Sequence, residues 1–500
     1  MTPKRKNAAP LITLSHASRG FPIYRQVYET LRQSILSGHL PAKSQMPSTR
    51  SLAAQLAVSR MTIVTAYEQL LAEGYIEGRS GSGTYVASVL PEEMLEIRDK
   101  KSPESKTPAS VSPILSKRGR LLASFDHTHL RASRTDKKFS AFHAGIPAMD
   151  AFPFDIWSRL MSRRLKGMSV SLFGSGNPAG YEPLRRAVAG YLRAARAVRC
   201  TSEQVFIVAG AQQALALIAQ VLVDEGDAVW VENPGHLGTR NLFAAAGAKI
   251  VSVPIDEEGF DLSFALQENK EARLACVTPS HQFPLGTVMS LSRRLALLKW
   301  AENYNSWIVE DDYDSEFRYA GRPLASLQGL DEHAGNRVIY VGTFSLTIFP
   351  ALRLGYMIVP ENLLDVFTAA RALTDSHSPS IDQAALTDFV EEGHFARHLR
   401  KMRALYAERQ TALVSAARNE LTGLLEVPAD RAGTHLIGWL PNGLSAKSVS
   451  QKASAQGVIT NPLSAYSSKK LAREGLILGY TAFTPGQIRN GVKRLAKILG

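Results

Sequence analysis

Apolar residues recur at helical spacing near the start of the chain and predict three short helices. They are expected in 21–38, from Pro47 through Leu56, and from Ser59 to Gly74. The apolar stripe of the first helix comprises Tyr24, Val27, Tyr28, Leu31 and Ile35, and that of the third Ile63, Ala66, Tyr67, Leu70 and Leu71. The second and third helices follow each other closely enough to predict a helix-turn-helix.

Two β-prone runs, 75–77 and 84–86, flank a glycine-rich stretch and predict a hairpin after the third helix. Together these elements predict an all-α, winged helix-turn-helix domain in 15–88. Residues 89–139 are rich in Pro, Ser, Lys and Glu without apolar periodicity, which predicts a flexible linker.

From residue 140 onward, strand-like and helix-like segments alternate, which is typical of a mainly parallel α/β sheet. Strands are expected at 205–208, 228–231, 249–253, 274–278, 307–309 and 337–341, and helices at 211–222, 237–246 and 291–302. After about residue 373 the pattern changes to a long charged helix at 395–417, strands at 434–440 and 476–478, and a closing helix from 485. This predicts a large domain in 140–372 and a smaller α+β domain in 373–500.

The composition is that of a globular protein with more than one domain, because 500 residues exceed the usual size of a single one. No uninterrupted apolar run reaches the roughly 18 residues of a membrane-spanning helix, and the first residues lack an apolar leader. Cys200 and Cys276 cannot make a disulfide framework. We therefore expect a cytoplasmic protein with no membrane partner.

The positive charge is concentrated at the front of the chain. The whole chain carries +13, and residues 1–90 contain ten Lys or Arg against four Glu, a local charge of +6. Such asymmetry indicates a polyanionic partner, although a basic surface that only keeps the protein soluble is an alternative.

The motifs P-S-T-R-x-L-A, V-S-R-x-T and E-G-Y-I-x-x-x-x-G-S-G-T-Y-V lie in this basic region. They resemble the winged helix-turn-helix of the GntR family of bacterial regulators, which implies binding to double-stranded operator DNA, at the nucleoid. The resemblance implies DNA contacts by Ser48, Arg50, Ser59, Arg60, Thr62, Thr65 and Gly81. Arginine in the first turn of a recognition helix can reach guanine edges or phosphates. Alternatively, the two serines are only helix N-caps and the two arginines only solvated.

A second motif, G-T-F-S-L-T-I-F-P-A-L-R-L-G-Y, occupies 342–356. It resembles the segment that carries the Schiff-base lysine in the MocR subfamily of GntR-type regulators, where G-T-F-S-K-x-x-x-P-x-x-R-L-G-Y is typical. That resemblance implies a fold-type I aminotransferase-like domain in roughly 140–500. Leu346 stands at the lysine position, and an alkyl side chain has no nucleophile for the cofactor aldehyde. We therefore expect no internal aldimine, no aminotransferase activity and no catalytic residue.

The same resemblance implies a set of residues around pyridoxal 5'-phosphate. Asp311 and Tyr313 match the residues at the ring nitrogen and the ring hydroxyl, and His236 stands where a stacking tyrosine is usual. The phosphate side is matched by Gly210, Ala211, Thr343 and Arg353. A glycine turn before a helix can accept a phosphate on free N–H groups. Alternatives are a structural ion pair for Arg353 and a solvated or helix-capping role for the acidic run around Asp311.

Several departures from the family pattern weaken the same ligand. Ala209 replaces a common hydroxyl residue, and Phe173 replaces a tyrosine that reaches the partner subunit's phosphate. His281 lies in a turn that lines the pocket, and we interpret it as a hydrogen-bonded structural residue rather than an acid or base. No arginine for a substrate carboxylate and no metal ligand set is identified.

The first interpretation is thus a DNA-binding transcriptional regulator whose aminotransferase-like domain serves dimerisation or the sensing of a small-molecule effector. A homodimer is expected by resemblance. A second interpretation is a regulator that binds pyridoxal phosphate weakly and without a covalent bond. A third is a working aminotransferase that carries a winged helix, and Leu346 argues against it because no amine is present for the chemistry.

Overall fold

The computed structural model describes residues 21–79, 83–91, 115–125, 141–167, 172–321, 324–331 and 336–500. The chain forms two compact units, Met1–Pro113 and Ile114–Gly500, which are described separately below. Within the described residues, no helix is long and apolar enough to cross a membrane.

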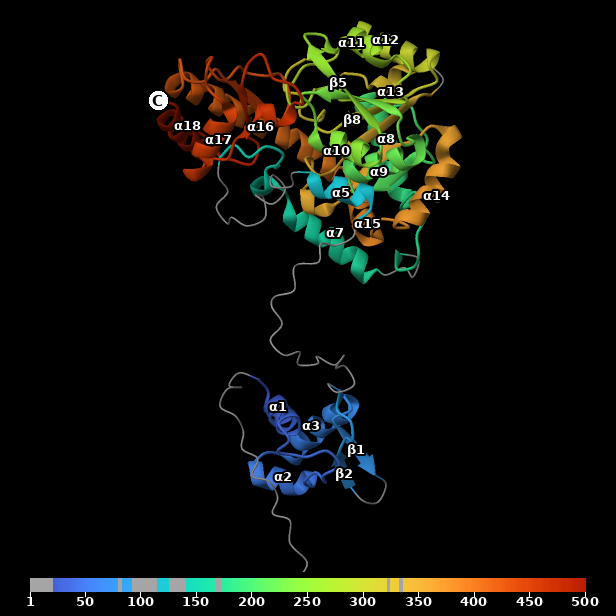
Figure 1. The fold of residues 1–500 in the computed structure, drawn as a ribbon, viewed down its shortest axis with the longest axis vertical. Coiled ribbons are helices and arrows are strands. Elements are labelled where there is room, and N and C mark those ends of the chain that lie inside the picture. Colours follow the sequence, from blue (N-terminus) through green and yellow to red (C-terminus); the bar gives the residue numbers. More distant parts are fainter. Residues whose placement is uncertain are drawn as a thin grey trace, which may run out of the picture. The chain divides into compact units, whose positions relative to one another are not determined.

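The first unit contains the predicted helix-turn-helix and hairpin (Figure 1). Its elements are α1 (Ile23–Leu36), α2 (Thr49–Leu56), α3 (Arg60–Ala72), β1 (Ile76–Arg79) and β2 (Gly83–Val86). Strands β1 and β2 pair antiparallel. One apolar cluster joins all three helices to the hairpin, through residues such as Leu31, Leu52, Ile63 and Val86. The apolar periodicity therefore predicted this fold correctly.

Two residues of the predicted apolar stripes are not in the core. Tyr24 of α1 is 37% exposed and Leu71 of α3 is 50% exposed, whereas their neighbours in the stripes are buried. Both lie at the margin of a stripe, and a domain this small buries only the middle of each helical face.

The second unit is built on an eight-stranded sheet with the strand order β3-β10-β9-β8-β7-β4-β5-β6. Its strands are β3 (Val205–Val208), β4 (Ala228–Asn233), β5 (Lys249–Asp256), β6 (Gly259–Phe260), β7 (Leu274–Val277), β8 (Trp307–Asp312), β9 (Val338–Thr343) and β10 (Gly355–Ile358). The pairs from β9 through β8, β7 and β4 to β5 are parallel, and β10 runs antiparallel to both of its neighbours. The mainly parallel sheet is as predicted.

Helices cover both faces of this sheet (Figure 1). Those whose residues share core clusters with the strands are α8 (Glu182–Arg196), α9 (Ala211–Leu222), α10 (Leu237–Ala245), α11 (Leu262–Asn269), α12 (Leu291–Asn303), α13 (Leu327–Leu330), α14 (Leu364–Thr374) and α15 (Ser380–Glu391). Alternate residues of a strand face opposite sides, so that Val229 packs in the cluster of α9 and Trp230 in that of α12. The sheet is therefore the middle of three layers.

The carboxy-terminal lobe is a separate small sheet with its own helices. It consists of α16 (His394–Glu420), β11 (His435–Trp439), α17 (Ala446–Ala455), β12 (Asn461–Pro462), β13 (Gly475–Gly479) and α18 (Pro485–Leu499). The strand order is β11-β13-β12, with both pairs antiparallel. Two further helices, α5 (Lys117–Ser124) and α7 (Phe154–Lys166), precede the large sheet, and α5 lies in the segment that composition predicts as linker.

Candidate functional site

The two serines of the helix-turn-helix cap its second and third helices. The Ser48 hydroxyl accepts the Ser51 amide at 3.1 Å, and the Ser59 hydroxyl accepts the Thr62 amide at 3.1 Å. The hydroxyls of Ser59 and Thr62 are also 2.8 Å apart. Each serine thus satisfies an N–H group that the helix itself leaves without an acceptor.

The predicted DNA-contacting side chains lie at the start of these capped helices. Arg50 and Arg60 are exposed in the first turns of α2 and α3, Thr65 is exposed one turn further along α3, and Thr62 is half-buried. Gly81 lies outside the described residues. A capped helix start with an exposed arginine is the arrangement that a recognition helix presents to the major groove. Contact of each residue with DNA stays a prediction.

In the second unit the candidate ligand residues gather at one edge of the large sheet. Gly355 at the start of β10 is paired with Val208 at the end of β3 and with Thr343 at the end of β9. Strand β8, which ends at Asp312, is parallel to β9 and pairs with it. Because the carboxyl ends of parallel strands meet at one edge, residues after β3, β8 and β9 are brought together there.

The phosphate side of the site combines a helix start with a guanidinium group. Gly210 caps α9 with a φ of 106°, a conformation that glycine adopts without strain. A Cβ atom at Gly210 would lie 3.7 Å from Nη2 of Arg353. Ala211 begins α9, whose first N–H groups have no acceptor within the helix. Thr343 donates its hydroxyl to Ser345 Oγ at 3.0 Å. These groups form a cup that suits an anion.

The turn before this cup is held by side chains of the protein itself. The Ala209 amide donates to Oε1 of Gln213 at 2.7 Å, and Nε2 of Gln213 donates to Asp375 at 2.7 Å. Ala209 brings no hydroxyl, and its amide is engaged by the next turn of the helix. The phosphate side therefore relies on the first turn of α9, Thr343 and Arg353.

On the ring side, Asp311 presents a buried carboxyl oxygen without a partner. Its side chain is 8% exposed and Oδ1 has no hydrogen bond. Burial, together with the nearby charges of Asp312 and Glu232, raises the pKa of Asp311 to about 7. Asp312 is engaged elsewhere, since Arg196 donates to it at 2.8 Å. An orphaned oxygen of this kind fits a cationic ring nitrogen, which would pair with it and return it to the carboxylate form.

Aromatic and imidazole rings connect the two sides of the site. The ring of Phe283 lies 6.0 Å from that of Tyr313 and 6.1 Å from that of His236. His236 is exposed and caps α10, with Nδ1 3.1 Å from the Thr239 hydroxyl. A Cβ atom at Gly238 would meet both Nε2 of Gln212 and the ring of His236, so α9 and α10 begin side by side. The predicted ligand residues are thus close in space.

Leu346 lies in the turn after β9. It is half-buried and packs against the apolar core cluster of the second unit. The candidate ligand residues fit pyridoxal phosphate: the start of α9 and Arg353 would hold the phosphate, Asp311 the ring nitrogen and Tyr313 the ring hydroxyl. When bound, that group supplies an electron sink to an amine substrate. Leu346 itself offers only apolar contact.

Sequence reasoning gave no role to two acidic residues, one at this edge and one in the carboxy-terminal lobe. Glu232, at the end of β4, accepts the amide and the hydroxyl of Thr278 at 2.9 and 2.6 Å. Burial raises its pKa to about 7. The sequence could have indicated Glu232 as a site residue, because an acidic residue at the end of a buried strand lies on the same sheet edge as Asp311. Asp430 comes from the carboxy-terminal lobe, 149 residues beyond His281, and no local pattern indicates it.

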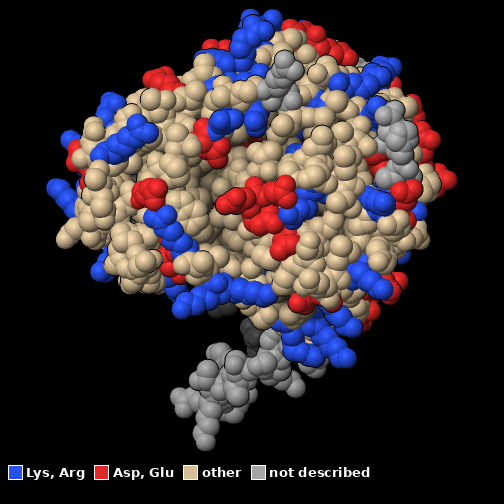
Figure 2. Space-filling model, turned by 90° about the horizontal axis from the view of Figure 1, so that it is seen from above, with Lys and Arg blue, Asp and Glu red and all other residues tan. Residues whose placement is uncertain are grey.

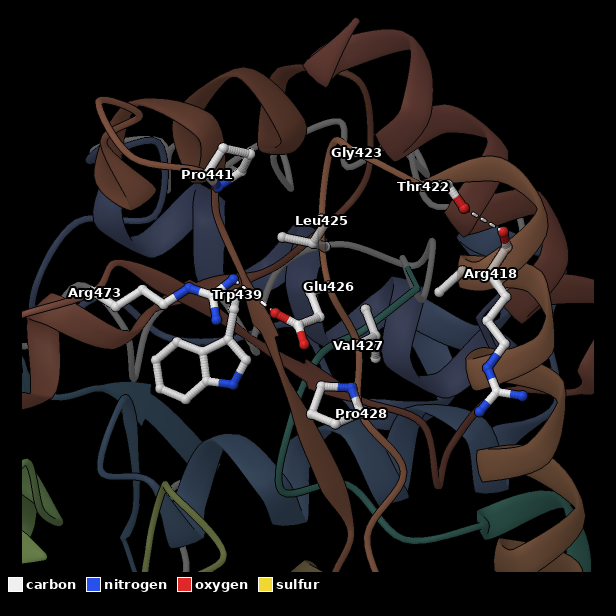
Figure 3. Close-up of a pocket in the computed structure, with 11 residues that line it drawn as sticks. Arg418, Thr422, Gly423, Leu425, Glu426, Val427, Pro428, Trp439, Pro441 and Arg473 are labelled. Carbon is white, nitrogen blue, oxygen red and sulfur yellow. Dashed lines mark hydrogen bonds and ion pairs between the residues drawn. The ribbon is translucent and has the colours of Figure 1, made fainter.

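Other surface features lie apart from this site. Figure 2 shows acidic and basic side chains interspersed over the described residues of one face, without a continuous basic stripe there. The carboxy-terminal lobe contains a cavity of about 540 Å³. Arg473 pairs there with Glu426 at 2.8 Å and lies over the ring of Trp439. Figure 3 shows these residues in the lining of the cavity. None of the candidate ligand residues lines this cavity. In the part of the chain that the structure covers, no three His, Cys, Asp or Glu are grouped to hold a metal ion.

Two known families match the chain, and each match falls within one of the two structural units. Residues 23–86 match the bacterial regulatory proteins of the gntR family, and 148–495 match aminotransferase class I and II. The probable rhizopine catabolism regulatory protein MocR of Rhizobium meliloti is 43% identical over 95% of this chain and 93% of its own length. The chain belongs to the MocR-type GntR regulators.

Further relatives agree with this family. The pyridoxine biosynthesis regulator PdxR of Corynebacterium glutamicum is 31% identical over 80% of each chain. The kynurenine aminotransferase of Pyrococcus horikoshii has a similar structure, with a TM-score of 0.69, 26% identity, and coverage of 77% of this chain and 96% of its own. The GntR-type unit of a MocR-type regulator implies operator DNA as a partner, and the aminotransferase-like unit suggests pyridoxal phosphate binding.

The raised pKa of Asp311 leads to a stability prediction for the ligand-free protein. The pKa of Asp311 is about 7 in the folded protein, compared with an ordinary value of 3.8. The folded protein therefore favours the protonated carboxyl, and the stability of the fold decreases as pH rises from about 4 to about 7. Asp311→Asn keeps the shape without the charge. We expect it to be more stable than the parent at pH 8, by about 1–3 kcal/mol, and equal to it near pH 4.

Urea unfolding of both proteins at the two pH values measures this difference. Glu257→Gln is a control, because it removes an exposed carboxyl from the turn between β5 and β6, outside the site, and should change the stability little at either pH. A variant that is less stable than the parent at pH 8 would mean that Asp311 is ionised and paired in the empty site.

Proposed function

We propose that this regulator senses a ligand with its aminotransferase-like unit and does not bind pyridoxal phosphate covalently. The observation that carries the proposal is Leu346, a half-buried alkyl side chain that by motif resemblance stands where the family has its Schiff-base lysine. The unit is then not an aminotransferase, since it lacks the amine that would bond to the cofactor and move a proton on it. Its role is effector sensing and dimerisation, in the cytoplasm.

Non-covalent pyridoxal phosphate is the ligand that the site supports best. The unpartnered oxygen of Asp311 and the cup of Gly210, Thr343 and Arg353 are suited to its two charged ends. One of the relatives is named as a regulator of pyridoxine biosynthesis, which supports a vitamin B6 compound as the first ligand to test. Without the covalent bond, retention depends on the phosphate contacts, the Asp311 contact and stacking, so we expect weak binding.

Borohydride reduction followed by mass spectrometry of the intact chain tests the absence of a covalent bond. We expect the purified protein to be colourless, or yellow only with added pyridoxal phosphate and bleached by dialysis. After reduction, the chain mass should stay unchanged, because no amine stands at residue 346. A pyridoxyl group on any lysine would show that another amine has taken over, and the exclusion of aminotransferase chemistry would be withdrawn.

Dimerisation is a further part of the proposal. Two helix-turn-helix units on a two-fold axis would contact two half-sites of an operator. Phe173 is 49% exposed and is the type of apolar group that a second subunit would cover. We expect light scattering to give the mass of two chains at micromolar concentration. A single chain of 54.5 kDa, with no increase when operator DNA is added, would rule out this arrangement.

A further inference from the structure

His281 connects the two lobes of the second unit through a buried ion cluster. Its side chain is 3% exposed, in the turn between β7 and α12. Nδ1 lies 3.0 Å from Asp314, in the loop after β8, and Nε2 lies 3.4 Å from Asp430, in the loop before β11 of the carboxy-terminal lobe. One imidazole therefore bridges carboxyl groups of the large sheet and of the carboxy-terminal lobe.

The contacts require His281 to be a cation. Burial by itself lowers the pKa of an imidazole, but Asp314 and Asp430 outweigh it and raise the pKa of His281 to about 10. Burial raises the pKa of Asp430, but the hydrogen bond and charge of His281, together with the amides of Arg431 and Ala432, outweigh burial and lower it. An imidazolium donates from both nitrogens, so it can serve both carboxylates at once.

Space for this bridge is made by two glycines. A Cβ atom at Gly433 would lie 2.3 Å from Cε1 of His281, and one at Gly286 would lie 2.5 Å from the Asp430 carboxyl. Side chains at either position would separate the charged groups. The two lobes can therefore approach this closely only because glycine occupies positions 286 and 433.

The bridge also reaches the candidate ligand site. The Tyr313 hydroxyl lies 3.2 Å from Nδ1 of His281, and burial and a hydrogen bond to Asp314 raise the pKa of Tyr313. Asp314 therefore accepts from both Tyr313 and His281. The imidazolium offsets part of the Asp314 charge and weakens the hold of Asp314 on the Tyr313 proton, which favours donation by the Tyr313 hydroxyl to a ligand.

We propose that His281 is a positioning residue that couples closure of the two lobes to the orientation of the Tyr313 hydroxyl at the ligand. The proposal rests on the proposed function, since it takes the site around Tyr313 to bind pyridoxal phosphate. His281 touches no reacting atom and acts through Tyr313 and Asp430. Its loss would leave Asp314 to hold the Tyr313 hydroxyl and would leave Asp430 without its cation.

The other polar groups next to the bridge have hydrogen-bond partners of their own. The ring of His435 lies 6.0 Å from that of His281, but its Nε2 donates to the Pro284 carbonyl at 2.9 Å, and burial and the His281 charge lower its pKa. The Asp430 amide donates to Oε1 of Gln410 at 3.3 Å. His435 is therefore a neutral neighbour that takes no part in the bridge, and it provides a matched control.

The first measurement is the affinity of the full-length protein for added pyridoxal phosphate. We expect His281→Gln and Asp430→Asn each to weaken it about ten-fold, the usual cost of a lost charge-assisted hydrogen bond. The double variant should be no weaker than the weaker single one, because both changes break one bridge. The pH at which the hydroxyl of bound ligand ionises, followed by absorbance, should shift in His281→Gln and stay unchanged in His435→Gln. Additive losses, or parental affinity in His281→Gln, would overturn the proposal.

The second measurement needs no ligand. Hydrogen exchange of the free protein should become faster in 281–287 and 430–440 for both His281→Gln and Asp430→Asn, to the same extent. It should stay unchanged in these segments for His398→Gln, which removes a buried imidazole of α16 outside both of them. If the parent binds no pyridoxal phosphate, the proposed ligand is wrong, and exchange still decides whether the bridge holds the lobes. Unchanged exchange in both bridge variants would overturn the bridge itself.

Discussion

Leu346→Lys should allow the protein to form a visible absorption band with pyridoxal phosphate. The substitution places an amine in the turn after β9, where the motif of 342–356 resembles the segment that carries the Schiff-base lysine. The lysine stem can cover the apolar surface against which Leu346 packs, so the fold should tolerate it. A spectrum before and after dialysis, followed by borohydride reduction and mass analysis, measures the gain.

The matched control is Leu346→Met, which has similar volume and flexibility but no amine, and it should give no band. A Leu346→Lys protein that folds, binds DNA and still gives no band would contradict the expectation. Ala209, Phe173 and His236 would then have changed the pocket for a different effector.

Local sequence signals were sufficient where neighbouring residues determine the structure. Helix α9 spans Ala211–Leu222 as predicted, because Gly210 ends the preceding turn and an unbroken apolar stripe follows. Strand β8 continues past the predicted end at Val309 to Asp312. Its last three residues are acidic and look like a loop in the sequence, but in the fold they are buried, and Asp312 is paired with Arg196. Tertiary pairing thus overrides the polar pattern.

The site shows the same limit. Motif resemblance indicated Asp311, Tyr313, Thr343 and Arg353 as ligand residues, and the structure places them at the ends of strands β8, β9 and β10, of which the pattern had not predicted β10. Residues contributed by the carboxy-terminal lobe were not found. Asp430 has no motif of its own, and its contact with His281 exists only because the fold brings the two loops together.

Replacement of Arg60 by alanine should weaken operator binding by about 1–3 kcal/mol, roughly 5- to 150-fold, if the side chain makes a bidentate contact with a base. Arg60 is exposed in the first turn of α3 and directly follows the capping residue Ser59. Alanine is favourable in a helix, and the cap is untouched, so the loss would come from the interface rather than from unfolding. A gel-shift titration at fixed salt measures it.

A charge-matched control is Arg489→Ala on α18, which removes the same charge from the other unit and should leave operator affinity unchanged.

Titrations at several salt concentrations separate two roles of Arg60. A phosphate contact would weaken binding to all sequences alike and reduce the salt dependence by about one ion, whereas a base contact would reduce discrimination at one position of the operator. An Arg60→Ala protein that binds its operator as tightly as the parent would remove this residue from the interface. Recognition would then have to rest on Arg50 and the threonines of α3.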